Sequence, residues 1–378
     1  MGGNIFQNSR RYLKEEYFEL ESTVINKLFY CIFNEKFYNK KLDINVLEYI
    51  HPIKAYKNKK TFGDMDICIS SEHLKHNWIE SIIDAFNLNY ITQDDWKKNS
   101  NVFSFLYNSF QIDLIICNPN EFQTSINYYA YNDLNNLVGR ISKKLGLKFG
   151  HRGLEFVFKN NDNVLGSINL TKDLKTIYEL LDLNYNEYLN GFNELDDMFV
   201  WISNSKYFNK DIFLLHNRNA TSRVRDKKRA TYTTFLLWCD SREFKNNYPY
   251  KIITEFGGYN IRQPFFDDLI CVQFPQAREF YNSTIEKYVL NLKFKEKFNG
   301  NICTQLTGLI GKNLGAFMSW ARTQINNNNM NRVFINYKEH TCNAVIRSLY
   351  HHYINNQEWL KFDYQLAVQI ARNEGLVK

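Results

Sequence analysis

Apolar residues near the start of the chain recur with helical spacing. Between residues 11 and 33, Leu13, Tyr17, Leu20 and Val24 follow one another at intervals of three or four positions. A single stripe of this kind predicts an amphipathic helix. We expect its apolar face to pack on a sheet, because a surface helix hides that face against a core.

The period changes to two over residues 62–69. The segment FGDMDICI begins at a glycine turn and then alternates Met and Ile side chains with Asp and Cys. This alternation predicts a strand with two different faces. Because every second side chain of a strand lies on the same face, Asp64 and Asp66 are expected to point the same way.

A third acidic residue lies in a second strand region. Residues 103–116 predict a hairpin that turns at Asn108 and Ser109. In its second strand, one face is apolar, and Asp113 lies on the other face inside an otherwise apolar run. The preceding residues 72–86 carry an apolar stripe and predict a further helix.

The pattern changes again near residue 168. From Thr171, a residue type that caps helix N-termini, helical stripes dominate and strand signals are few. We therefore predict an α+β fold, with a mixed sheet and packed helices in residues 1–168 and a mainly α-helical domain in residues 169–378. Helices are expected near residues 194–205, 210–217, 228–240, 276–292, 312–325, 340–356 and 362–374.

Charge and cysteine usage narrow the class of protein. The net charge of +7 favours a polyanionic partner, although an ordinary solvated surface explains it nearly as well. Seven cysteines are scattered singly without a CxxC pair, which argues against a disulfide framework and a zinc ribbon and favours a reducing compartment. The sequence has neither a membrane-spanning apolar run nor a signal-peptide pattern, so we predict a cytoplasmic protein without a membrane partner.

The three acidic residues suggest a metal site. Two Asp residues at positions i and i+2 of a strand, with a third on a neighbouring strand, can supply oxygen ligands to paired divalent ions. Such ions neutralise phosphates and activate a hydroxyl group, as phosphoryl and nucleotidyl transfer require. The alternative is that Asp64 belongs to a turn, Asp66 faces solvent and Asp113 is an isolated acid.

Two segments resemble a known family. Residues 53–66, IKAYKNKKTFGDMD, resemble the DNA polymerase beta signature, in which a Gly-Ser pair and basic residues lead into Gly-Asp-x-Asp. Residues 110–114, FQIDL, look like the third-carboxylate strand of that family, and residues 128–158 are loosely similar to its nucleotide-binding segment. The resemblance covers residues 50–160 and implies a polymerase-beta-like palm.

The resemblance also implies an activity. It implies a nucleotidyltransferase that moves a nucleoside monophosphate from a nucleoside triphosphate to a hydroxyl group and releases pyrophosphate. Asp64 and Asp66 would then bind two Mg²⁺ or Mn²⁺ ions, and Asp113 would bind the ion that activates the hydroxyl.

The phosphate ligands are expected on basic residues. The Gly-Ser position of the signature holds Ile-Lys here, so we expect Lys54 and Lys57 to bind the departing phosphates while Gly63 lets the chain approach the triphosphate. In the segment similar to the nucleotide-binding region, Lys144 and Arg152 are further predicted nucleotide ligands. A solvated loop and ordinary surface cations are the respective alternatives.

Other segments resemble uncharacterised bacteriophage nucleotidyltransferases that join this catalytic domain to a helical one. They are the opening MGGN, the basic LHNRNATSRVRDKKRATY and the glycine-rich LTGLIGKNLGAF. The abundance of Lys, Asn, Phe and Tyr fits an AT-rich genome, which is compatible with a phage origin. For a phage protein, the expected location is the cytoplasm of the infected bacterium.

A dense basic cluster predicts nucleic-acid binding. Six cations within twelve residues suit contact with a phosphate backbone, and a helix with a charged solvent face is the alternative. The predicted nucleic-acid-binding residues are Arg218, Arg223, Arg225, Lys227, Lys228 and Arg229. The preferred acceptor is therefore a nucleic-acid 3′ end, with RNA such as tRNA favoured. The alternatives are nucleotidylation of a protein or small molecule, and non-catalytic nucleic-acid binding on a transferase scaffold.

Overall fold

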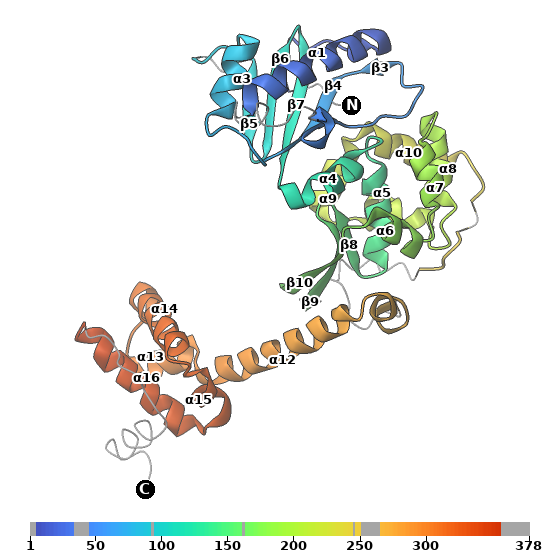
Figure 1. Cartoon of the computed structure of the whole chain (residues 1–378). Coiled ribbons are helices and arrows are strands. Elements are labelled where there is room, and N and C mark those ends of the chain that lie inside the picture. The colour runs from blue at the N-terminus through green and yellow to red at the C-terminus, as the bar shows by residue number, and fades with distance from the viewer. Residues whose placement is uncertain are drawn as a thin grey trace. The chain divides into compact units, whose positions relative to one another are not determined.

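The computed structural model describes residues 5–33, 45–91, 94–160, 163–244, 246–250 and 265–356 (Figure 1). The chain forms two compact units, Met1–Arg278 and Glu279–Lys378. The predicted boundary at residue 168 falls inside strand β10 (Asn163–Thr171), within the first unit. The helix predicted over residues 362–374 lies outside the described residues.

A five-stranded mixed sheet forms the first half of unit 1. Its strands run in the order β2-β4-β7-β6-β5, with β4 and β7 parallel and the other neighbours antiparallel. Their bounds are β2 Ile50–Pro52, β4 Asp64–Ser70, β5 Trp96–Asn99, β6 Val102–Tyr107 and β7 Phe110–Cys117. The α+β class and the mixed sheet predicted from the sequence are thus confirmed.

Two helices cover one face of this sheet. Helix α1 (Lys14–Ile32) and helix α3 (Trp78–Phe86) pack with the inward side chains of β4 and β7 into one apolar core (Figure 1). Leu20 and Val24 of α1 share this core with Met65 and Ile112, as the helical stripe predicts. The hairpin β6–β7 turns at Asn108 and Ser109, both with positive φ (51° and 59°).

The opposite face of the sheet is covered in part by helix α4 (Phe122–Tyr129). Phe122 and Ile126 of α4 pack on Cys68 and Cys117, near the ends of β4 and β7. The strand positions that precede these cysteines on the same face carry the three acidic residues. The apolar cover therefore ends where the carboxylates begin.

The rest of unit 1 joins a small antiparallel sheet to a group of helices. The sheet has the order β10-β9-β8, with β8 at Leu147–Gly150 and β9 at Gly153–Asn160. The main helices are α5 Leu134–Lys144, α6 Leu174–Leu180, α7 Tyr185–Asn190, α8 Leu195–Ser203, α9 Ala220–Lys227, α10 Ala230–Asp240 and α11 Cys271–Gln273. Two predicted helices differ, since residues 210–217 form two short 3₁₀ turns and residues 228–229 separate α9 from α10.

The N-cap of α6 lies two residues later than predicted. Thr171 is the last residue of β10, and Asp173 is the N-cap, because its Oδ2 accepts the backbone N–H of Thr176 at 2.8 Å. The Thr171 hydroxyl instead accepts the backbone N–H of Asp173 at 3.0 Å. Thr171 therefore supports the turn that leads into the helix.

Unit 2 is helical in its described part. It contains most of α12 (Gln276–Lys297), followed by α13 Gly300–Thr307, α14 Gly311–Asn327, α15 Asn331–Asn336 and α16 Glu339–Ile354. Phe298, Phe317 and Phe334 are buried in its own apolar core. Among the helices that the structure describes in either unit, none is long and apolar enough to cross a membrane.

Candidate active site

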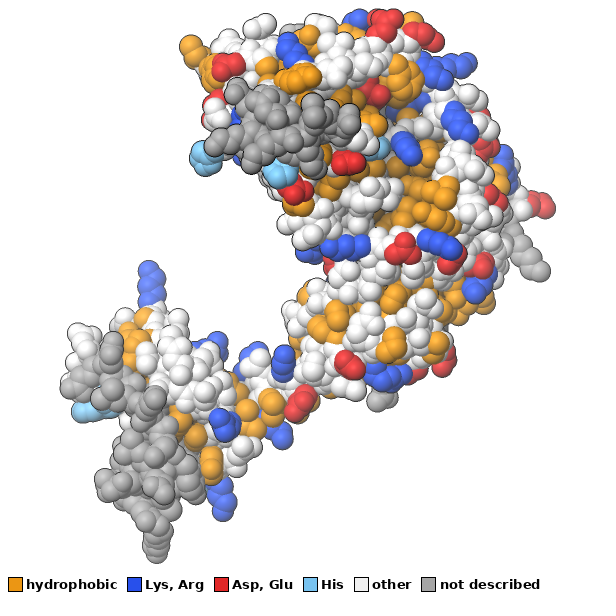
Figure 2. Space-filling model, in the orientation of Figure 1, with side chains coloured by type: hydrophobic (Ala, Val, Ile, Leu, Met, Phe, Trp, Pro, Cys, Tyr) orange, Lys and Arg blue, Asp and Glu red, His pale blue; other side chains and the backbone are white. Residues whose placement is uncertain are grey.

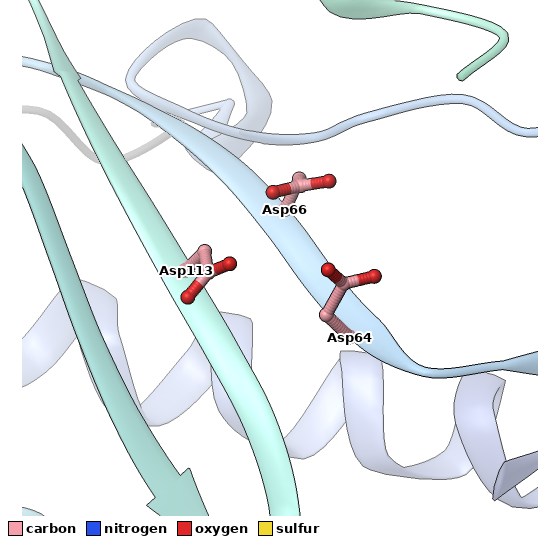
Figure 3. Close-up of side chains that lie close together, drawn as sticks. All are labelled: Asp64, Asp66 and Asp113. Atoms are coloured by element: carbon pink, nitrogen blue, oxygen red, sulfur yellow. The ribbon is translucent and has the colours of Figure 1, made fainter. Parts of the chain in front are cut away.

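Three carboxylates meet on one face of the five-stranded sheet. Asp66 of β4 and Asp113 of β7 are partners in the register of the parallel pair, and Asp64 lies two residues before Asp66. One ligand oxygen from each of the three side chains lies within 4.8 Å of the others (Figure 3). The convergence expected from the sequence is confirmed, and this trio could hold a metal ion.

The Asp113 carboxylate is fixed by its neighbours. Its side chain is 9% exposed, and Gln111 Nε2 donates to both of its oxygens, at 3.1 Å to Oδ1 and 2.9 Å to Oδ2. The Gln111 side-chain oxygen accepts the backbone N–H of Ile5 at 3.0 Å. Ser104, opposite Asp113 on β6, also forms a side-chain hydrogen bond with it. The third acid is therefore oriented before any ion binds.

The carboxylates repel one another electrostatically. Burial, followed by the negative charges of Asp64 and Asp113, holds the pKa of Asp66 well above its usual range, and Lys59 opposes this effect. Burial also raises the pKa of Asp113, against the lowering effect of its hydrogen bonds with Ser104 and Gln111. A divalent cation would remove this repulsion, and an all-oxygen ligand set suits Mg²⁺ or Mn²⁺.

The trio opens into a cleft within unit 1. The cavity has a volume of about 810 Å³, and both Asp64 and Asp66 line it. Cations face it from the loop before β4 and from the region of α9 and α10. Predicted site residues that line it are Lys54, Gly63, Arg225, Lys228 and Arg229. These residues, which are far apart in the sequence, therefore surround one space next to the carboxylates.

Residues 54–60 form a lysine-rich loop before β4, and its Lys59 interacts electrostatically with Asp64 and Asp66. It lines the cleft, burial lowers its pKa, and the charges of Asp64 and Asp66 oppose that lowering. Lys57 is exposed and does not line the described cleft; its backbone N–H donates to the Phe192 carbonyl at 2.8 Å. The geometry therefore does not support Lys57 as a phosphate ligand. The sequence analysis did not single out Lys59, because the sequence alone does not distinguish it from the other three lysines of this loop.

The predicted nucleotide ligands Lys144 and Arg152 lie away from the carboxylates. Arg152 lines a second cavity of about 490 Å³, whereas Lys144 lines neither of the two described cavities. Local sequence placed both residues after the third acidic strand, but it could not show which way the end of α5, with Lys144, and the β8–β9 turn, with Arg152, face. As nucleotide ligands beside the trio, neither fits the structure.

Arg218 is a structural residue and not a solvent-facing cation. Its side chain is 1% exposed, forms an ion pair with Asp226, and donates from Nη1 to the Tyr232 hydroxyl at 2.6 Å. Asp226 is fully buried and also pairs with Arg225 at 3.0 Å and Arg140 at 3.6 Å. The prediction that Arg218 contacts nucleic acid is therefore wrong, because the guanidinium neutralises a buried carboxylate.

The other members of the basic cluster divide into two groups. Arg225, Lys228 and Arg229 line the carboxylate cleft, with Arg229 paired to Asp133 and Arg225 donating to Asn136 Oδ1 at 3.1 Å. Arg223 and Lys227 are exposed and line neither described cavity. On the face drawn in Figure 2, Lys and Arg side chains are interspersed with acidic and apolar ones. On that face, the positive charge does not form one continuous patch.

Comparison of the chain with protein-family models and with curated proteins gives no match. Interpretation of the cleft therefore depends on its geometry and chemistry.

Proposed function

We propose that this chain is a metal-dependent nucleotidyltransferase with a palm of the DNA polymerase beta type. The observation that carries the proposal is the meeting of Asp64, Asp66 and Asp113 at one edge of a cation-lined cleft. Neutral substrates do not need such a combination of hard oxygen ligands and facing cations, whereas a triphosphate with bound ions does.

The residues have separate roles in this proposal. Asp64 and Asp66 would hold two divalent ions and Asp113 would hold one of them; bound Mg²⁺ or Mn²⁺ would neutralise charge and lower the pKa of the acceptor hydroxyl. Lys54 and Lys59 bind phosphate oxygens from the side of the β4 loop. Gln111 keeps Asp113 in its orientation.

The reaction is an in-line displacement at phosphorus. The acceptor hydroxyl oxygen forms a bond to the α-phosphorus of the nucleoside triphosphate, the bond from that phosphorus to the bridging oxygen breaks, and pyrophosphate leaves. The hydroxyl proton passes to solvent. The cations of the cleft stabilise the negative charge that develops on the leaving group.

A nucleotide-labelling experiment tests the proposal. Full-length protein is incubated with each nucleoside triphosphate, labelled in its α-phosphate, together with Mg²⁺ or Mn²⁺ and total bacterial RNA. Label is expected in RNA with the wild type and with Asp240→Ala, an exposed residue outside the cleft, and is expected to fall to background with Asp64→Ala. Equal labelling by Asp64→Ala and wild type would contradict the proposal.

Two other results would change the activity assigned to the cleft. Label confined to protein bands or to a small molecule would move the acceptor away from nucleic acid. Metal-dependent nucleotide binding without transfer would make the chain a binding protein on a transferase scaffold.

A further inference from the structure

A second cavity adjoins the carboxylate cleft. It lies within unit 1, has a volume of about 490 Å³, and shares Tyr128, Asn136 and Arg225 with the cleft. Its walls come from α5, the β8–β9 turn and α9. The cations that line it are Arg140, Lys143, Lys148, Arg152 and Arg225.

Positive charge exceeds negative charge in this cavity. Among the described residues, Glu155 is the only acidic one that lines it, and its carboxylate is already paired with Lys148 at 3.0 Å and Arg152 at 3.2 Å. Arg140 and Arg225 are paired with the buried Asp226, which does not line the cavity. In the part of the chain that the structure describes, no carboxylate forms an ion pair with Lys143. A bound anion would supply the missing partner.

The surroundings of Lys143 oppose its positive charge. Burial lowers its pKa, and the neighbouring cations Lys159, Lys144 and Arg225 lower it further. Bringing like charges together costs free energy unless a counter-charge is present. A chain of phosphates could interact with Lys143, Lys148 and Arg152 at once.

Aromatic rings lie between the cations. Tyr128 and Phe149 line the second cavity, with ring centroids 5.4 Å apart, and Tyr128 also lines the carboxylate cleft. The His151 ring is stacked with Tyr129 at 6.3 Å. Rings interleaved with cations are the arrangement by which proteins hold single-stranded nucleic acid, because bases stack on the rings while cations bind the backbone.

We infer that the second cavity binds the sugar-phosphate backbone of a single-stranded nucleic-acid 3′ end, whose terminal nucleotide lies beside Tyr128 and presents its hydroxyl to the carboxylate cleft. This inference rests on the proposed nucleotidyl transfer. It moves the main acceptor contacts from the surface cations Arg223 and Lys227 to Lys143, Lys148 and Arg152. Arg225, which lines both cavities, then lies at the junction of the two substrates.

Binding of RNA without turnover tests the inference. Fluorescence anisotropy of a labelled single-stranded oligoribonucleotide is measured with the full chain in EDTA and without nucleotide, at several salt concentrations. Lys143→Gln and Arg152→Gln are expected to weaken binding on the order of fivefold each and to reduce the magnitude of the salt slope by about 0.7. Lys175→Gln, a change at an exposed lysine outside both cavities, is the matched control and is expected to leave binding unchanged.

The outcomes separate this inference from the proposed function. Wild-type affinity and an unchanged salt slope in both cavity variants would overturn the inference. Arg152→Gln remains an independent test if Lys143→Gln folds poorly. If inorganic phosphate or pyrophosphate displaces the labelled oligonucleotide at concentrations similar to those at which unlabelled oligonucleotide does, the inference is overturned and the cavity is a small-anion site. If RNA binding depends on Lys143 and Arg152 but the protein transfers no nucleotide, the proposed function is overturned and the cavity remains a nucleic-acid-binding site.

Discussion

The side-chain amide of Gln111 holds both carboxylate oxygens of Asp113, two residues further along the same face of β7. Because the Gln111 side-chain oxygen also accepts the Ile5 backbone N–H, the amide cannot rotate without losing a second contact. Residues of this kind hold metal ligands in place, and their loss weakens metal binding even though they do not touch the ion.

Replacing Gln111 with Leu is therefore expected to weaken Mn²⁺ binding about 10–100-fold while the protein remains folded. The change removes the Gln111 hydrogen bonds that lower the pKa of Asp113, so this pKa should rise further and protons should compete better with the ion for the carboxylate. Isothermal titration with Mn²⁺ measures the affinity. Gln123→Leu, at an exposed position of α4, is the control, and equal affinities for the two variants would contradict the role of Gln111.

The repulsion among the three acids predicts a gain in stability when one is neutralised. A raised carboxylate pKa means that the folded protein binds more protons than the unfolded chain between the ordinary and the raised pKa, so stability falls as pH rises through that window. In EDTA at neutral pH, Asp66→Asn is expected to raise Tm by about 2 °C or more. With Mg²⁺ or Mn²⁺, Tm should rise for wild type and not for the variant.

Differential scanning fluorimetry over a range of pH values measures both effects. Asp240→Asn, outside the cleft, serves as the control and should follow the wild type with and without ions. A lower Tm for Asp66→Asn in EDTA would show that the carboxylates stabilise the fold without an ion.

The buried ion pair predicts a structural role for Asp226. Asp226→Ala leaves the Arg218 guanidinium buried, and among the described side chains the Tyr232 hydroxyl remains as its hydrogen-bond partner. Because an uncompensated buried charge is costly, the free energy of unfolding is expected to fall by about 3–5 kcal/mol. Urea unfolding measures the change; Asp268→Ala, at an exposed site of the same unit, should have little effect. If Asp226→Ala leaves the stability unchanged and weakens RNA binding, the structural role is contradicted and Arg218 contributes to nucleic-acid binding.

Lys59 and Lys57 are expected to differ in nucleotide binding. Lys59 lines the cleft beside the carboxylates, so Lys59→Gln should weaken triphosphate binding on the order of tenfold through loss of a charged hydrogen bond. Lys57→Gln should have little effect, because Lys57 does not line the cleft. Equilibrium binding of a fluorescent nucleoside triphosphate in Mn²⁺ compares them, and a larger loss with Lys57→Gln would reverse the assignment.

Sequence periodicity was sufficient for the parts of the fold that depend on neighbouring residues. The period of two predicted Asp64 and Asp66 on one face, and the turn at Asn108 predicted that the strand carrying Asp113 pairs with the strand before it, β6. Both follow from local geometry, since a strand alternates its faces and a short turn fixes which strands pair.

Tertiary contacts decided the features that the sequence did not show. Asp226 is the single acidic residue within the basic segment 218–229, and this position among cations indicates that an arginine of the segment neutralises it. In the structure, the buried Arg218 is such a partner. No local pattern identifies which lysine of a loop faces the carboxylates, because loop conformation depends on packing against residues distant in sequence. The same reason explains why Arg152 faces a second cavity.

The parallel pairing of β4 and β7 has a consequence for how the protein folds. Parallel neighbours cannot be joined by a tight turn, and α3, β5 and β6 all lie between them in the chain. The β6–β7 hairpin, whose contacts are local, can form early, whereas β4 must dock from a distance. The acidic trio is therefore completed only at that late docking step, so divalent ions would stabilise the finished sheet without helping the hairpin to form.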